Sequence, residues 1–199
     1  MKALHRPDMF SWSVFDAPRN VDFHGHLIVR EGGNVVVDPM PLSDHDLAHL
    51  DALGGAAWIV VTNSDHLRST VELAAHTGAK VAAPAAESGS WDGAVDRWLK
   101  DGDTLVPGVT VLTVDGSKTA GELVVRVENT LIMGDLVRAH QGGRLNILPA
   151  PKLRDPAAAV ASVARLAALD GIDAVLVGDG WPVFRDGGRA LCELAASLA

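Results

Sequence analysis

Short apolar runs alternate with amphipathic segments along the chain, which predicts strands followed by helices. In the first half, the apolar runs 23–29 and 34–37 flank Glu31-Gly32-Gly33 and predict a β-hairpin. Residues 58–61 and 80–83 predict two further buried strands. Ser43, with Asp46 three residues later, predicts the start of a helix that Gly54-Gly55 ends. A second helix is expected from about Asp65 or His66 to His76.

The second half repeats the pattern with longer strands. Residues 109–114, 122–128 and 130–133 predict an antiparallel meander with a tight turn at Glu128-Asn129. Asp155-Pro156 predicts a helix start, because a capping residue is followed by proline at the first helical position. A buried strand is expected at 174–177 and a last helix at 188–198. Residues 138–154 carry no clear periodicity, which predicts a long loop and a wall of a cleft.

Helices that follow strands in both halves favour an α/β (α+β) architecture with four layers. The simplest arrangement is an αββα sandwich, in which two mixed β-sheets pack face to face and helices cover both outer faces. The length of 199 residues and an apolar content of 48% fit one such domain over residues 1–199.

Composition and charge exclude several classes of function. The net charge of −8 disfavours a nucleic-acid surface and an anionic membrane surface. No apolar run approaches the ~20 residues that span a bilayer. The single cysteine, Cys192, cannot form an internal disulfide, and we expect a cytoplasmic protein. A small-molecule substrate or ligand is the expected partner, and the sequence leaves undecided whether the protein forms a homodimer.

Polar residues follow four of the predicted strands. The segments are Thr62-Asn63-Ser64-Asp65-His66, Gly116-Ser117-Lys118-Thr119, Gly134-Asp135 and Gly178-Asp179-Gly180. Loops at strand ends of α/β sheets converge on shared clefts. Three carboxylates beside one imidazole are unfavourable unless a cation lies among them. The pattern therefore points to a metal site or to the remnant of one.

Together these segments resemble the metallo-β-lactamase fold superfamily, whose first motif reads His-x-His-x-Asp-His. The matching stretch runs from Val61 to His66, with Val61 and Asn63 in place of the two leading histidines. The turn 115–122 resembles the next motif, with Ser117 or Lys118 where the family has a histidine. The remaining matches are the bridging Asp135, Asp179 in place of the last histidine, and the early strand that ends in Asp38-Pro39.

The resemblance implies a metal-dependent hydrolase with an altered site. The three-histidine position is lost, and the implied metal ligands are Asp65, His66, Asp135 and Asp179. Such an oxygen-rich set favours one divalent ion, Mn²⁺, Fe²⁺ or Mg²⁺ over Zn²⁺. Asp65, His66 and Asp135 would be the catalytic residues, acting on an ester, thioester or phosphoester through a metal-bound water.

The residues leave a second interpretation open, in which the protein holds no metal, is catalytically inactive and acts as a ligand-binding or scaffold protein through the same cleft. The ammonium of Lys118 would then lie among Asp65, Asp135 and Asp179, and Lys118→Ala would destabilise the protein markedly. In either case Lys118, Arg138 and His140 are the candidate substrate-binding residues. Arg68 could pair with Asp179 or with a ligand, and of these a structural ion pair is expected. His24 and His26 are expected to share one face of the hairpin without binding metal.

Overall fold

Alternate side chains of the central strands enter different apolar layers. In the computed structural model, which describes residues 1–199, Val35 and Val37 of β4 (Val35–Val37) pack between the sheets, while Val36 faces the helices. In β5 (Trp58–Val60), Val60 faces the other sheet and Ile59 the helices. Successive side chains of a strand point to opposite faces, so a continuous apolar run marks a strand that is buried on both sides.

The first sheet has seven strands in sequence order. Neighbouring strands are antiparallel from β1 to β4 and parallel from β4 to β7. Besides β4 and β5, its strands are β1 (Lys2–Ala3), β2 (Met9–Asp16), β3 (Val21–Ile28), β6 (Lys80–Pro84) and β7 (Arg97–Leu99). The predicted hairpin is confirmed as β3 and β4.

The second sheet has five strands in the order β14-β11-β10-β9-β8. Only the β11–β14 pair is parallel, so this sheet is also mixed. Its strands are β8 (Thr104–Val106), β9 (Val109–Val114), β10 (Glu122–Val127), β11 (Thr130–Ile132) and β14 (Ala174–Leu176). The predicted meander is confirmed as β9, β10 and β11.

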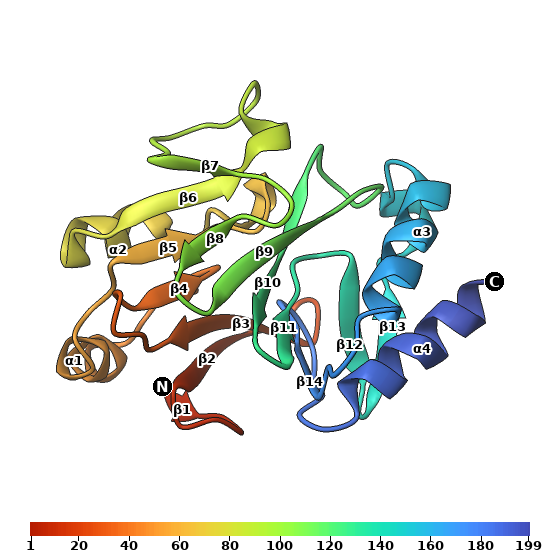
Figure 1. Cartoon of the computed structure of the whole chain (residues 1–199). Coiled ribbons are helices and arrows are strands. Elements are labelled where there is room, and N and C mark those ends of the chain that lie inside the picture. The colour runs from red at the N-terminus through yellow and green to blue at the C-terminus, as the bar shows by residue number, and fades with distance from the viewer.

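Three apolar clusters separate four layers. One lies between the sheets, one joins the first sheet to α1 (Asp44–Ala52) and α2 (Thr70–Thr77), and one joins the second sheet to α3 (Pro156–Ala167) and α4 (Gly187–Leu198). In Figure 1, α1 and α2 lie on one side of the strands and α3 and α4 on the other. The predicted αββα sandwich is therefore confirmed.

The predicted starts of α1 and α3 are confirmed, and each has a capping side chain. Ser43 accepts a hydrogen bond of 3.2 Å from the backbone of Asp46, and Asp155 accepts two of 3.0 Å at the start of α3. The helix expected from Asp65 or His66 begins only at Thr70. Residues 64–66 form a 3₁₀ turn, η1 (Ser64–His66), and a positive φ of 40° at Arg68 separates the turn from α2.

The long loop predicted at 138–154 is largely ordered, so that prediction is wrong. It contains most of a two-stranded ribbon, β12 (Val137–Gln141) and β13 (Arg144–Ile147), followed by the 3₁₀ turn η3 (Ala150–Lys152). Another 3₁₀ turn, η2 (Ala85–Glu87), follows β6. Leu145 and Ala139 pack into the cluster that holds α3 and α4, so this ribbon is anchored by burial.

Residues 178–181 join the first sheet to the ribbon through the backbone. The amide of His24 donates to Gly178 O at 2.9 Å, and that of Gly180 donates to Asp22 O at 3.0 Å. On the other side, the amide of Trp181 donates to Ala139 O at 2.7 Å. This segment, which we call the joint, fixes Asp179 between β3 and β12.

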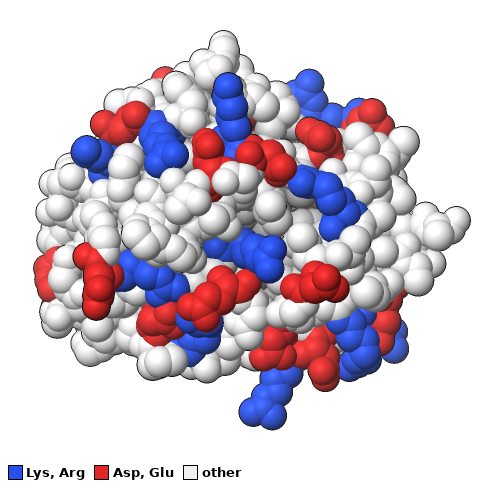
Figure 2. Space-filling model, viewed as in Figure 1, with Lys and Arg blue, Asp and Glu red and all other residues white.

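Charged side chains are mixed over the face seen in Figure 2, where Lys and Arg alternate with Asp and Glu without a large area of one sign. No helix of the structure has both the length and the apolar character needed to cross a bilayer.

Candidate functional site

His66 is held from both sides by carboxylates. Asp38 directly follows β4, and Thr62 follows the neighbouring parallel strand β5, so the two strand ends place them side by side. Asp38 accepts from the backbone amide of Thr62 at 2.8 Å and from its hydroxyl at 2.6 Å. His66 donates through Nδ1 to Asp38 Oδ2 at 2.7 Å, and its Nε2 lies 3.4 Å from Asp135 Oδ1.

This arrangement keeps the imidazole of His66 protonated. Burial alone would lower its pKa, but the charge of Asp38 and hydrogen bonds to Asp135 and Asp38 raise it to about 9. Burial likewise opposes ionisation of Asp135, yet His66, Lys118 and Arg138 lower the pKa of that carboxyl to about 2. At neutral pH the centre of the site is an imidazolium between two carboxylates.

Asp65 is paired with Lys118 and not with His66. The Lys118 ammonium forms a salt bridge with Asp65 Oδ2, and both side chains are about two-fifths exposed. Asn63, in a position where the family motif has histidine, accepts from the backbone of Asp65 at 3.0 Å and caps η1. Lys118 thus contacts one of the three carboxylates that it was expected to join.

Asp179 is paired with Arg138 and His140. The Arg138 Nε lies 2.9 and 2.7 Å from the two Asp179 oxygens, and His140 Nε2 lies 3.1 Å from Oδ2. Arg138 and His140 come from β12, which the joint holds against Asp179. Two of the expected substrate-binding residues therefore bind a carboxylate of the protein itself, and Arg68 forms no ion pair with Asp179.

The two histidines of β3 hydrogen-bond to the backbone. Their rings are stacked with centroids 6.1 Å apart. His24 Nε2 lies 2.6 Å from Gly180 O, and His26 Nε2 lies 3.3 Å from Val177 O. Burial lowers the pKa of His26 to about 3, which keeps it neutral.

Sequence reasoning missed two buried glutamates beside the site. Glu122 accepts from the Ser117 hydroxyl at 2.5 Å and from the backbone of Leu136 at 2.9 Å. Glu87 accepts from the backbone of Ser64 at 2.7 Å and of Gly121 at 3.1 Å. Burial raises the pKa of Glu122 to about 7, and the charge of Asp135 adds to this. The only signal for Glu122 was a charged residue at the start of an apolar strand.

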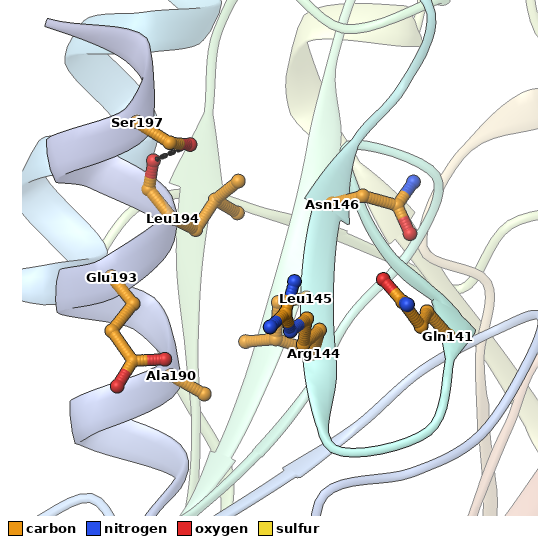
Figure 3. A pocket seen from close by; sticks show the side chains of 8 residues that line it. All are labelled: Gln141, Arg144, Leu145, Asn146, Ala190, Glu193, Leu194 and Ser197. Atoms are coloured by element: carbon orange, nitrogen blue, oxygen red, sulfur yellow. Dashed lines mark hydrogen bonds between the residues drawn. The ribbon is translucent and has the colours of Figure 1, made fainter.

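The strand ends open into a cavity of about 460 Å³, which we call the His66 cleft. Its lining residues are Asp16, Arg19, Phe23, Met40, Asp65, His66, Arg68, Lys118 and Asp135. Asp179, Arg138 and His140 do not line it. A second cavity, of about 340 Å³, lies between α4 and the β12–β13 ribbon and is lined by none of the predicted site residues (Figure 3).

The residues do not fit a resident metal ion as they are arranged. No group of three or more His, Cys, Asp or Glu side chains lies together in a way that could hold one. Of the four predicted ligands, only His66 and Asp135 approach each other, with Nε2 of His66 3.4 Å from Oδ1 of Asp135. One observation favours a bound cation: Asp135 Oδ2 is buried without a hydrogen-bond partner.

Comparison with solved structures shows the same fold over nearly the whole chain. A metallo-β-lactamase from Pontibacter korlensis has a TM-score of 0.74 at 16% identity, covering 98% of this chain and 97% of that one. The DIM-1 metallo-β-lactamase has a TM-score of 0.73 at 17% identity, with 98% and 95% covered. TTHA1623, solved in a di-iron-bound form, has a TM-score of 0.68 at 21% identity, with 92% and 98% covered.

No curated protein matches the sequence. The sequence profile described as the metallo-β-lactamase superfamily matches residues 1–198. The strand-end segments that resemble this superfamily thus lie in a chain that matches it from end to end, and the chain belongs to the metallo-β-lactamase superfamily.

Proposed function

We propose that this chain is a metal-independent member of its superfamily that binds a small molecule in the His66 cleft. One observation carries the proposal: the side chains left for metal ligation are each engaged by another side chain of the same chain. His66 contacts Asp38 and Asp135, Asp65 contacts Lys118, and Asp179 contacts Arg138.

The state of His66 supports this interpretation. A histidine binds a metal through a neutral nitrogen, so a metal would have to displace a proton held with a pKa of about 9. The Nδ1–H bond to Asp38 is compatible with a metal ligand, because such bonds orient ligating imidazoles. Nε2, however, faces Asp135, and the protonated ring already neutralises the Asp135 carboxylate, which a metal ion would otherwise neutralise.

The state of Asp179 supports it further. Its side chain is 3% exposed and that of Arg138 is 13% exposed. Recruiting Asp179 to a metal would leave a largely buried guanidinium without its counter-charge, which is strongly unfavourable. Asp65 could be recruited at a lower cost, because its pair with Lys118 is open to solvent.

A metal-dependent hydrolase is the second candidate, and the unpartnered Oδ2 of Asp135 favours it. Membership in the superfamily supports metal-dependent hydrolysis in general, and solved relatives include a mono-zinc form and a di-iron form. On this reading Asp65, His66, Asp135 and Asp179 would rearrange around one ion of Mn, Fe, Mg or Zn. Lys118 and Arg138 would have to release their carboxylates.

Metal analysis separates the two candidates. Protein purified without chelator is soaked in Mn²⁺ or Zn²⁺, passed over a desalting column and analysed by mass spectrometry, with Asp135→Asn as the matched control. We expect below about 0.1 equivalent bound in both proteins and no change of Tm with EDTA. Binding of about one equivalent that is lost in Asp135→Asn would overturn the proposal and favour the hydrolase.

A further inference from the structure

Arg68 is the one cation of the His66 cleft without a carboxylate partner. Three Arg and Lys side chains and three carboxylates line the cleft, together with His66. Arg19 pairs with Asp16 at 3.3 Å, Lys118 with Asp65, and His66 with Asp135. Arg68 forms no salt bridge and donates through Nη1 only to the backbone oxygens of His24, at 2.8 Å, and Asp38, at 3.2 Å.

The backbone holds Arg68 in a conformation that its side chain does not favour. Its φ of 40° is positive, as is that of its hydrogen-bond partner Asp38, at 48°. Left-handed backbone disfavours residues with a Cβ atom, and such strain concentrates at functional positions. The two bonds from Nη1 fix the guanidinium plane, while Nε and Nη2 have no partner in the protein.

A second guanidinium lies near the same aromatic ring. The Arg68 guanidinium carbon is 5.6 Å from the centre of the Phe23 ring, and that of Arg19 is 5.7 Å from it. Contacts of this kind stabilise a cation beside the ring face. Phe23 and Met40 supply the apolar lining of the cleft.

We propose that Arg68, in the cleft that Arg19 and Phe23 also line, forms a subsite for a small oxyanion, a carboxylate or a phosphate. A guanidinium presents parallel N–H groups that match two oxygens of such an anion. Arg68 lines the cleft without a salt bridge to any carboxylate of the protein, although the chain as a whole carries a net charge of −8. The proposal rests on the proposed function, because it names the class of ligand for the same cleft.

The test follows the Arg68 Nε–H signal by ¹H–¹⁵N NMR during titration with inorganic phosphate and, separately, with acetate at constant ionic strength. We expect saturable shifts with a Kd of about 1 mM for the preferred anion, since one charged group in an open cleft binds weakly. Comparing the two titrations distinguishes a phosphate from a carboxylate ligand.

Variants test whether the anion binds to the Arg68 side chain, and binding is measured from shifts of backbone amide signals. Arg68→Gln and Arg68→Gly should each weaken binding at least about tenfold, the loss expected for a charge-assisted pair. Arg68→Gly is included because glycine adopts the positive φ freely, so it keeps the test open if Arg68→Gln fails to fold. Arg189→Gln, on the exposed face of α4, should bind as the parent does.

Absence of shifts with both anions, or unchanged binding in Arg68→Gly, would overturn the subsite. The outcome is separate from that of the metal analysis. Anion binding in a protein that also takes up a metal would retain the subsite and reject the metal-independent function. A protein that binds neither metal nor anion would reject the subsite and leave the absence of a metal standing.

Discussion

The guanidinium of Arg138 closes on the carboxylate of Asp179, with Nε 2.9 and 2.7 Å from its two oxygens. Because this pair is largely buried, removing one partner leaves the other charge uncompensated. We predict that Asp179→Asn lowers the free energy of unfolding by about 3 kcal/mol or more in urea denaturation. The double variant Asp179→Asn with Arg138→Met should recover part of the loss, and a double variant no more stable than the single one would contradict this account.

Lys118→Ala should behave differently. Lys118 and Asp65 also form an ion pair, but 43% of the Lys118 side chain and 42% of the Asp65 side chain are exposed. Exposed ion pairs contribute little, so we predict a loss below about 1 kcal/mol in urea denaturation. This replaces the sequence-based expectation of marked destabilisation. A loss as large as that of Asp179→Asn would show that Lys118 has a more central role.

Asp38→Asn should release the proton of His66. Asparagine tolerates the positive φ at this position and keeps a hydrogen bond to the Thr62 amide. It removes the negative charge of Asp38, which raises the pKa of His66 against the effect of burial. We predict that the pKa of His66 falls from about 9 by at least about 2 units. NMR titration of the imidazole signals measures it, with the exposed His76 as an internal reference. An unchanged pKa would show that Asp38 does not set the charge of His66.

Glu122 should make the protein less stable as the pH rises. Its pKa is raised to about 7 in the folded state from a reference value of 4.5, so the folded protein binds the proton more tightly than the unfolded chain does. This favourable contribution is complete below about pH 4.5 and is lost as the pH rises through about 7, amounting to about 3 kcal/mol.

The matched variant is Glu122→Gln, which can keep both hydrogen bonds without a charge. Relative to the parent, it should gain about 3 kcal/mol of stability between pH 4.5 and pH 8 in urea denaturation. Parallel pH profiles for the two proteins would refute the assignment.

Gly116→Ala should disrupt the loop that carries Ser117 and Lys118. A Cβ atom there would lie 2.2 Å from Asp155 O and 2.3 Å from Ala159 N, at the start of α3. Gly78 is the control, because it has a similar positive φ but open space around it. We predict a loss of about 1 kcal/mol for Gly78→Ala and a several-fold larger loss for Gly116→Ala by urea denaturation. Equal losses would mean that α3 can shift to make room.

The fold was predictable because apolar runs and capping residues repeat through the chain. The runs that became β4, β5, β10 and β14 are buried on both faces, and this burial makes them visible as short unbroken apolar stretches. Ser43 and Asp155 marked the starts of α1 and α3 correctly. The ribbon β12–β13 escaped detection because Arg138, His140 and Arg144 break its apolar pattern.

The site was less predictable because the sequence does not show which charges pair. Asp65, Asp135 and Asp179 all follow strand ends, as expected, but each is neutralised by a different cation. These pairings depend on β12, which brings Arg138 to Asp179, and on the loop that brings Lys118 to Asp65. Glu122 was overlooked because its partners, Ser117 and the Leu136 amide, come from two other loops.

The joint at residues 178–181 makes the arrangement around Asp179 dependent on the late part of the polypeptide. During synthesis the whole first sheet emerges before the segment that bonds to His24 and Asp22 exists. Until Gly180 arrives, β3 lacks these contacts, and Arg138 has no acidic partner to neutralise it. A ribosome-bound chain stopped before the joint would therefore lack both α4 and the backbone bonds that hold β3 and β12 on either side of Asp179.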